Sequence, residues 1–293
     1  MGTGLTCPIC GAADTRLHHD QGVRRVLKCR ACRLVFVDPL PSSDEKAEVE
    51  RAAFEGETLP ETADFFGECG SDYKEGPLVR DFTSALDSIG RAHPPGDMLE
   101  VGVGTGLFLH LARERGWRPF GIDICGASAI KAAGDFELSV DVGDFAEYAY
   151  GSDSFDCIAM LDVLEHTLDP AAILAKACGI LRPGGVIYIA VPNQDSMLTR
   201  LVDLYAKCKG PGAKWMLERL YVEPHLYYFR PALLSSVLEN TGFEMLSVEG
   251  ANPYLGRYGL PLWMRVPAEL ILRTGAALGM PARTMVLARK PAA

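Results

Sequence analysis

Four cysteines near the N-terminus have the spacing of a metal-binding ribbon. Cys7, Cys10, Cys29 and Cys32 form the pattern C-x2-C-x18-C-x2-C. Each C-x-x-C pair supplies two thiolates from one tight turn, and four thiolates complete the tetrahedral coordination of a structural zinc ion. Two disulfides are one alternative, but no secretory signal precedes the pattern. A redox pair is another, but one C-x-x-C would suffice for it. Iron also binds four thiolates, although a ribbon favours zinc. The spacing predicts a Zn²⁺ site in a zinc ribbon over residues 1–40.

A glycine-rich turn lies between a predicted strand and a predicted helix. The apolar segment 98–101 runs into Gly102, Gly104 and Gly106, and an amphipathic helix follows. Glycines allow the backbone to turn sharply and to approach a ligand at the start of the helix. The dinucleotide fingerprint would place its third glycine at Leu107, and the G-K-[ST] of a phosphate-binding loop is absent. The turn therefore predicts a ligand site of another kind.

Acidic residues follow the next apolar segments at the point where each predicted strand ends. Asp123 follows 117–122, Asp144 follows 140–142 and Asp162 follows 155–160, while a fifth strand is predicted at 186–191. Alternating strands and helices indicate an α/β fold in which helices cover both faces of a parallel sheet. The carboxyl ends of parallel strands meet at one edge, where ligands bind. We therefore expect these acids to gather around one ligand.

Taken together, these segments resemble the class I S-adenosylmethionine-dependent methyltransferases. The matching pieces are LEVGVGTG, GID, GDF, FDCIAMLDVLEH and ILRPGGVIYIAVPN, which occur in the order of that family over residues 96–193. The later segments HLYYF, ENTGFEMLSVE and TMVLARKP resemble its closing elements. The likeness is greatest to the branch typified by ubiquinone-biosynthesis and sugar methyltransferases, some of which carry an N-terminal zinc ribbon. It implies a Rossmann-like sheet of seven strands.

The resemblance also implies roles for individual residues around S-adenosylmethionine. It places Glu100, Gly102, Gly104 and Gly106 along the methionine part, Asp123 on the ribose, Ile124 near the adenine, Asp144 and Phe145 at the adenine amino group and ring, and Leu161 and Asp162 near the methyl group. Carboxylates around a sulfonium cation favour its binding without touching the methyl group. Methyl transfer is then an in-line displacement that depends mainly on positioning.

Two histidines are candidates for a catalytic base, which an oxygen or carbon nucleophile requires. His166 ends the LDVLEH segment, and His225 stands before Tyr227 and Tyr228 in EPHLYYF. Each histidine has an alternative role as a hydrogen-bonding residue that holds a loop. For His166 we favour that alternative, because LEH segments resemble a general feature of the branch. For His225 the two interpretations have equal support.

The charge distribution disfavours a nucleic-acid substrate. Residues 41–100 contain fifteen acids and five bases, and the whole chain has a net charge of −9. Nucleic-acid enzymes usually carry a continuous basic surface, whereas the ribbon has six bases and three acids. We therefore expect a methyltransferase for a small molecule, such as a sugar, a nucleotide-sugar or another secondary metabolite. An RNA methyltransferase with an RNA-binding ribbon and a non-catalytic S-adenosylmethionine-binding protein are the alternatives.

The remaining segments are expected to cover the methyltransferase domain, residues 96–293. Residues 41–95 predict an acidic helical linker or lid. Its Phe65, Phe66 and Tyr73 are expected either to face the cofactor or to pack between helices. Inserts are expected at 194–224, on the substrate side, and at 251–281. A peripheral membrane contact by 257–280 is the alternative to packing on the body, and we favour packing because prolines interrupt the segment. Without a spanning segment or a signal peptide, we expect a cytoplasmic protein.

Overall fold

A seven-stranded sheet forms the centre of the computed structural model, which describes residues 5–22, 24–54, 76–222, 224–255 and 261–292. The strand order is β10-β11-β8-β7-β4-β5-β6. Strand β11 runs antiparallel to both neighbours, and the pairs from β8 to β6 are parallel. The bounds are β4 (Asp97–Val101), β5 (Arg118–Asp123), β6 (Val140–Val142), β7 (Phe155–Leu161), β8 (Leu181–Pro192), β10 (Glu244–Ala251) and β11 (Arg283–Arg289).

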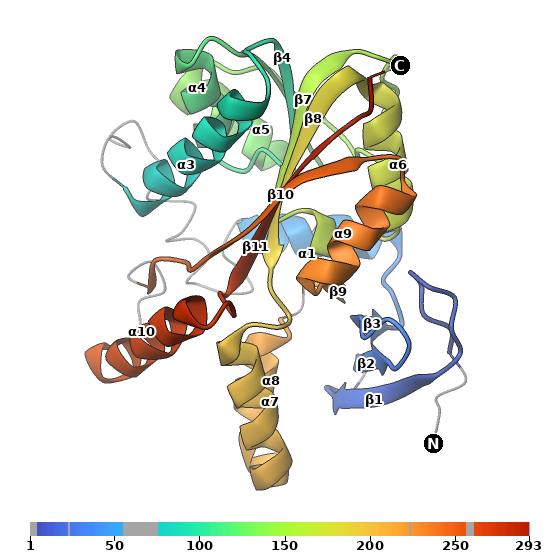
Figure 1. The fold of residues 1–293 in the computed structure, drawn as a ribbon, viewed down its shortest axis with the longest axis vertical. Helices are drawn as coiled ribbons and strands as arrows, with labels where there is room; N and C mark the ends of the chain where they lie inside the picture. Colours follow the sequence, from blue (N-terminus) through green and yellow to red (C-terminus); the bar gives the residue numbers. More distant parts are fainter. Residues whose placement is uncertain (1–4, 23, 55–75, 223, 256–260, 293) are drawn as a thin grey trace.

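Helices cover both faces of this sheet, as Figure 1 shows. One face carries α3 (Pro77–Ala92), α4 (Leu107–Glu114) and α5 (Gly126–Phe136), and the other carries α6 (Pro170–Ile180) and α9 (Pro231–Asn240). Apolar side chains fill the two interfaces in separate clusters, because strands buried on both sides present hydrophobic residues in both directions. The predicted α/β fold with a Rossmann-like seven-stranded sheet is therefore confirmed.

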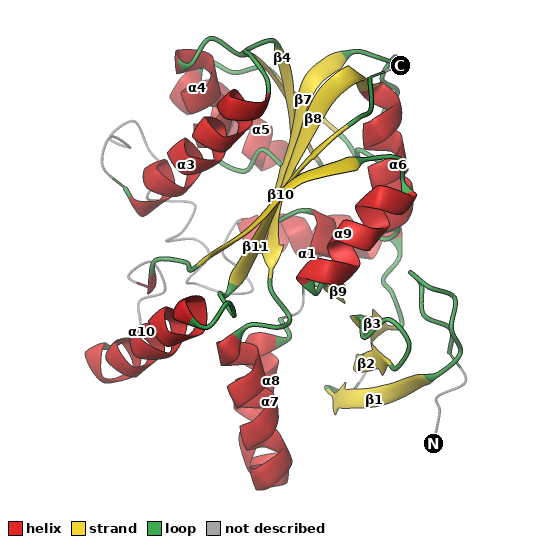
Figure 2. Cartoon of the chain, in the orientation of Figure 1, coloured by secondary structure: helices red, strands yellow, loops and turns green. Residues whose placement is uncertain are grey.

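The N-terminal strands form a second sheet that includes a short strand from residues 227–228. Its order is β1-β2-β3-β9, with β1 (Thr15–Asp20), β2 (Arg25–Cys29), β3 (Val35–Asp38) and β9 (Tyr227–Tyr228). Val35 pairs with Tyr228 and Phe36 with Tyr227. This small sheet lies beside the main body below α9 (Figure 2). The ribbon is thus joined by a backbone ladder to the segment that follows His225.

Helices occupy the three segments that lie outside the sheet core. The segment before the domain contains α1 (Ser43–Phe54); the first insert contains α7 (Met197–Lys209), the 3₁₀ turn η3 (Gly210–Ala213) and α8 (Lys214–Leu220); the second contains α10 (Leu262–Ala277). Val202, Leu217 and Tyr221 of the first insert pack against Val26, Val35 and Val37 of the ribbon. The first insert therefore covers one face of the ribbon sheet.

Two local expectations differ from the structure. Helix α10 continues through Pro267, although prolines were expected to interrupt this segment. A helix tolerates the missing N–H where neighbouring contacts compensate, and Leu272 and Gly275 of α10 are buried. The fifth strand was predicted over 186–191, but strand β8 begins at Leu181, which pairs with Phe155 before the register shifts. Within the part of the chain that the structure describes, no helix is both long and apolar enough to cross a membrane.

Candidate active site

The glycine-rich turn forms the floor of a cavity at the carboxyl ends of β4 and β5. Gly102, Gly104 and Gly106 all have positive φ angles, of 77°, 55° and 86°. A Cβ atom on Gly102 would lie 2.4 Å from the Cγ2 atom of Val163, so a larger residue does not fit there. The Gly102 N–H donates to the Ile122 carbonyl, with an N···O distance of 2.8 Å. The backbone is thereby held close to the cavity.

Asp123, at the end of β5, accepts hydrogen bonds that hold the glycine-rich turn in place. Its Oδ2 atom accepts hydrogen bonds from the Gly104 N–H (3.0 Å) and the Ser128 hydroxyl (2.9 Å), and its Oδ1 atom accepts from the Cys125 N–H (2.8 Å). Burial raises the pKa of Asp123, although these hydrogen bonds oppose that effect. Because a carboxylate offers about four acceptor positions, Oδ1 keeps capacity for a ligand hydroxyl.

Glu100 lies in the cavity wall with an unused acceptor. The residue is 2 % exposed, and its Oε2 atom has no hydrogen-bond partner among the described residues. Burial, and then the negative charge of Asp123, raise the pKa of Glu100 well above its usual value. Buried polar atoms are nearly always paired, so this oxygen indicates a ligand with a hydrogen-bond donor or a positive charge. The amino group of the methionine part of S-adenosylmethionine fits that description.

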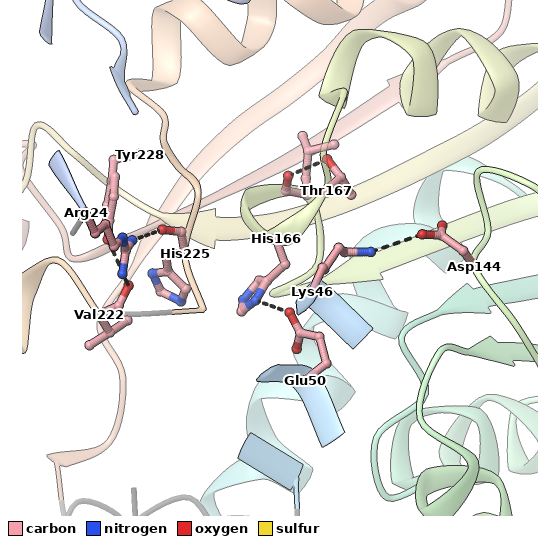
Figure 3. Close-up of polar contacts among 10 residues, drawn as sticks. Arg24, Lys46, Glu50, Asp144, His166, Thr167, Val222, His225 and Tyr228 are labelled. Carbon is pink, nitrogen blue, oxygen red and sulfur yellow. Dashed lines mark hydrogen bonds and ion pairs between the residues drawn. The ribbon is translucent and has the colours of Figure 1, made fainter. Parts of the chain in front are cut away.

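Asp144 and Phe145 lie across the cavity beside helix α1. The Asp144 carboxylate accepts a hydrogen bond from the Ala146 N–H (2.8 Å), and its other oxygen lies 3.2 Å from the Lys46 ammonium group. Phe145 is buried, with the Lys176 ammonium group 5.1 Å from its ring centre. Lys46 comes from α1, so the segment before the domain forms part of the cavity wall (Figure 3).

The end of strand β7 contributes Leu161 and Asp162 to the same cavity. Asp162 has a φ angle of 56°, which is uncommon for a non-glycine residue, and its N–H donates to the Ala190 carbonyl (2.9 Å). Its carboxylate accepts a hydrogen bond from Arg283, with an N···O distance of 2.6 Å. Arg283 begins strand β11, so this ion pair links the last strand of the sheet to the cavity.

The two candidate histidines lie next to each other. The ring centres of His166 and His225 are 4.8 Å apart, and the rings are nearly perpendicular at 80°. Figure 3 shows both rings together with Glu50 of α1. Glu50 Oε1 lies 2.8 Å from His166 Nδ1, so this nitrogen donates to the carboxylate. His166 is among the described residues that line the cavity, and His225 is not. The structure thus places His166 at the cavity wall, whereas the sequence favoured a loop-holding role for His166 and left His225 open between the two roles.

The surroundings move the pKa values of the two histidines in opposite directions. Burial lowers the pKa of His166, but the charge and hydrogen bond of Glu50, with Glu165 and Asp162, raise it to about 9. Burial, and then the positive charges of His166, Arg24 and Arg283, lower the pKa of His225 well below its usual value. Glu165 is 1 % exposed, and burial raises its pKa to about 8. The surroundings therefore favour the charged form of His166 and the uncharged form of His225.

Most predicted cofactor residues line one cavity of about 310 Å³. Nine of the ten do so: Glu100, Gly102, Gly104, Asp123, Ile124, Asp144, Phe145, Leu161 and Asp162. Gly106 instead forms the N-cap of α4. Sequence reasoning missed Lys46, Glu50, Asn252 and Arg283, which come from α1 and from around the second insert. The spacing of Lys46 and Glu50, one helical turn apart, was the available signal for α1. Phe65, Phe66 and Tyr73 lie outside the described residues.

The four N-terminal cysteines form a compact group away from this cavity. The Cys7 and Cys32 sulfur atoms are 3.6 Å apart, those of Cys10 and Cys29 are 3.7 Å apart, and all four lie within 4.8 Å of one another. A disulfide bond would require about 2.05 Å. Four thiolates bound at about 2.3 Å around a tetrahedral ion are separated by about 3.8 Å. The arrangement therefore fits a four-thiolate metal site. Of the other cysteines, Cys125 and Cys157 are buried, Cys178 is half-buried and Cys208 is exposed; Cys69 lies outside the described residues.

Comparisons with known proteins identify the family and the fold of this chain. The family model described as "Methyltransferase domain" matches residues 76–248. Two relatives named ubiquinone biosynthesis O-methyltransferase, from Leptothrix cholodnii and Saccharophagus degradans, are 26 % and 30 % identical; each alignment covers 56 % of this chain, and 71 % and 70 % of those proteins. Among solved structures, a chain from the complex between the Haloferax volcanii Trm112 methyltransferase activator and a methyltransferase aligns with a TM-score of 0.57.

That alignment has 17 % sequence identity and covers 86 % of this chain and 99 % of the other. A S-adenosylmethionine-dependent methyltransferase from Archaeoglobus fulgidus aligns with a TM-score of 0.54 and 22 % identity, over 77 % of this chain and 99 % of its own. At these identities the structures support the fold. With the family match over more than half of the chain, the protein belongs to the methyltransferase domain family and is a S-adenosylmethionine-dependent methyltransferase.

Proposed function

We propose that the protein transfers the methyl group of S-adenosylmethionine to a hydroxyl group of a small-molecule acceptor. The observation that carries this proposal is a single cavity whose wall runs from the glycine-rich turn to His166. One end offers the carboxylates expected for the cofactor, and the other offers a group that accepts a proton. The relatives reported above are named O-methyltransferases, which favours an oxygen acceptor.

The cofactor end fits S-adenosylmethionine through the residues that the sequence indicated. Asp123 would accept hydrogen bonds from the ribose, Asp144 and Phe145 would contact the adenine, and the unpartnered oxygen of Glu100 would meet the methionine amino group. The cofactor supplies a methyl group bound to a positively charged sulfur, which is already a good leaving group. The protein therefore contributes mainly the alignment of nucleophile, methyl carbon and sulfur.

The histidine end would remove the acceptor's proton. His166 lines the cavity, and its Nδ1 atom is held by Glu50, which leaves Nε2 as the basic nitrogen of the neutral ring. The positive charge that S-adenosylmethionine brings into the same cavity lowers the pKa of His166, so the neutral ring becomes available when cofactor is bound. His225 would complete this catalytic pair as its uncharged partner.

The net charge of the chain and the covering of the ribbon face by the first insert both bear on the class of acceptor. We propose a sugar, a nucleotide-sugar or another small metabolite, because the chain is acidic and the ribbon face formed by Val26, Val35 and Val37 is covered by the first insert. This covering removes one surface that an RNA substrate would use. In the same proposal, α1 within residues 41–95 acts as a lid, since Lys46, Glu50 and Phe54 line the cavity.

We also propose that the four-cysteine group binds Zn²⁺ and that residues 1–40 form a ribbon. The sulfur separations given above support a tetrahedral ion, and two of the thiols, Cys7 and Cys29, are buried. With four protein thiolates the coordination is closed, so the ion would be structural. Metal content of the purified protein, measured by plasma mass spectrometry, is expected to be one zinc per chain. Protein that is folded without metal would contradict the assignment.

The test of the function combines cofactor binding with an acceptor screen. Calorimetric titration is expected to show binding of S-adenosylmethionine and S-adenosylhomocysteine. Methyl transfer from labelled cofactor would then be measured on sugars, nucleotide-sugars and phenols, with transcribed RNA as the contrasting substrate. Turnover of a small molecule supports the proposal. Turnover of RNA alone, or cofactor binding without turnover of any member of a broad small-molecule panel, would contradict it.

A further inference from the structure

Two segments that precede the methyltransferase domain reach the candidate histidines. Helix α1 contributes Glu50 to His166, and the hairpin between β1 and β2 contributes Arg24 to the segment that carries His225 (Figure 3). The family model matches only residues 76–248. The residues that hold the histidines therefore come from outside the region that defines the family.

Glu50 makes a contact that fixes one orientation of the His166 ring. Its carboxylate lies 2.8 Å from Nδ1, and the two side chains are 23 % and 15 % exposed. An ionised carboxylate only accepts hydrogen bonds, so the proton of the neutral ring must sit on Nδ1. This contact also stabilises the positive charge that forms when Nε2 takes a proton. It has the geometry by which a carboxylate orients a catalytic histidine in other proton-transfer sites.

Arg24 holds the backbone on both sides of the His225 turn. Its guanidinium group donates to the Val222 carbonyl, with an N···O distance of 2.8 Å, and to the His225 carbonyl. Nearby, the Val37 N–H donates to the Leu226 carbonyl (3.0 Å), and the β3–β9 ladder follows. One rigid, planar side chain that binds two carbonyls restricts the backbone at His225 more than either bond alone.

We propose that Glu50 and Arg24 are positioning residues of the methyltransferase site: Glu50 orients the ring of His166, and Arg24 fixes the backbone at His225. The inference rests on the proposed catalytic role of the two histidines. In this proposal, the ribbon and α1 both hold the acceptor end of the cavity. Neither residue needs to touch the acceptor.

Other charged groups also lie near His166, and they influence its pKa together with Glu50. Glu165 and Asp162 lie on its own turn and at the end of β7, His225 lies across from its ring, and Arg283 approaches from β11. Only Glu50, among the described residues, makes a direct hydrogen bond to the ring. Removing its charge should therefore lower the pKa of His166 while the other groups remain.

Replacing Glu50 with glutamine tests the first half of the proposal. The pKa of His166 would be measured by NMR of ¹⁵N-labelled imidazole groups in the full-length protein, in parallel with the pH dependence of kcat. In Glu50→Gln the pKa should fall, and the rising limb of the pH profile should move to lower pH. The plateau rate should drop by about 10- to 100-fold, because the charged ring is no longer stabilised. Glu48→Gln, on the exposed face of α1, is the matched control.

A merely structural role of Glu50 would give a different result. It would lower the rate at every pH without moving the pKa of His166, and that outcome would overturn the assignment. A double variant further distinguishes a positioning role of Glu50 from a structural one. If Glu50 acts through His166, its replacement causes no further loss of rate once His166 is absent. In His166→Asn, the change Glu50→Gln should therefore leave the residual rate unchanged within about twofold.

Replacing Arg24 with glutamine tests the second half. We expect a fall in kcat and a rise in the acceptor KM, together about 10-fold in kcat/KM, since small misplacements of a catalytic group are costly. Affinity for S-adenosylhomocysteine should stay the same, because the glycine-rich turn is not touched. Arg16→Gln changes an exposed arginine of the same ribbon sheet and serves as the control. Equal losses in both variants, or a loss of cofactor affinity with Arg24→Gln, would contradict a local effect on His225.

Failure of this proposal can be distinguished from failure of the proposed function. If His166→Asn and His225→Asn both retain the wild-type rate, the histidines are not catalytic and the proposed mechanism is wrong. If those variants lose activity but Glu50→Gln and Arg24→Gln do not, only the positioning roles are wrong. Circular dichroism and cofactor binding, measured on every variant, would show whether a loss of activity comes from unfolding.

Discussion

The cofactor end of the cavity is built from residues close together in the chain, whereas the histidine end is built from distant ones. Glu100, the glycine-rich turn, Asp123 and Asp144 all fall between residues 100 and 145, at the ends of consecutive strands. Glu50, His166 and His225 come from three separate segments. The cofactor end is therefore formed by the sheet itself, whereas the histidine end depends on how the N-terminal segment and the inserts pack onto the sheet.

The largest expected effect tests whether the two ends can be separated. Cys29→Ser should release the metal and unfold the ribbon, because a structural zinc site contributes about 10 kcal/mol or more to folding. Since β3 pairs with β9, activity should be lost through the His225 segment while S-adenosylhomocysteine still binds. Metal analysis, thermal unfolding and calorimetry measure the three effects. Cys208→Ser, at an exposed thiol outside the group, is the control.

An equal loss of cofactor binding in Cys29→Ser would show that the two ends form one cooperative unit. The comparison would then fail, because the sheet could not hold the cofactor end without the ribbon. The same result would move Arg24 from a positioning role to a general structural one.

His166→Asn is expected to have the next largest effect and to act on the histidine end alone. A general base contributes about 10²- to 10⁴-fold, so kcat should fall within that range. The affinity for S-adenosylhomocysteine should change by less than about twofold, because no described contact joins His166 to the glycine-rich turn or to Asp123. Single-turnover rates and calorimetry give the two numbers. Unchanged turnover would remove His166 from the mechanism.

The difference between the ends also explains what could be predicted from the sequence. Strand ends are local features, because apolar runs and the acids after them are adjacent in the chain. For this reason nine predicted cofactor residues line the cavity. Gly106 carries the same local signal but caps a helix instead, so a turn motif does not specify which of its glycines lines the cavity.

Contacts between distant segments gave no comparable signal. A helical segment was predicted within residues 41–95, where α1 lies, but its pattern does not say that Glu50 meets a residue 116 positions later. Strand β9 has two residues and exists through its pairing with β3, so no periodicity announces it. Helix α10 passes through Pro267 because tertiary contacts outweigh local preference. Of these elements, α1 and β9 hold the histidine end.

Asp123→Ala should have a smaller effect, confined to the cofactor end. The variant loses the hydrogen bonds expected to the ribose and also the one from the Gly104 N–H. Hydrogen bonds to charged groups contribute about 1.5–3 kcal/mol, which corresponds to a 10- to 150-fold weaker affinity for S-adenosylhomocysteine. At saturating cofactor, the rate should remain closer to wild type than that of His166→Asn. Unchanged affinity, measured by calorimetry, would remove Asp123 from the cofactor site.

The smallest expected effect lies at the amino ends of the central strands β4 and β7, away from the cavity at their carboxyl ends. Asp156 accepts hydrogen bonds from the Asp97 N–H (2.7 Å) and from Arg182 (2.5 Å). Burial alone would raise the pKa of Asp156, but these bonds and the charge of Arg182 lower it overall. Because the folded-state pKa is lower than the unfolded-state value, the carboxylate stabilises the fold above the unfolded pKa. This contribution is lost as the pH falls through the folded-state pKa.

Asp156→Asn should therefore reduce the free energy of unfolding at pH 7 by about 1 kcal/mol, since Arg182 is partly exposed and its charge is screened. The difference between variant and wild type should shrink as the pH falls below the unfolded-state pKa, which is about 4, toward the lower pKa of the folded state. Urea unfolding at a series of pH values measures this convergence. Cofactor affinity and kcat should stay unchanged, because Asp156 contacts neither end of the cavity. A loss of either would mean that a change at the amino ends of the strands reaches the cavity at their carboxyl ends. The cofactor end and the histidine end would then both depend on the sheet that supports them.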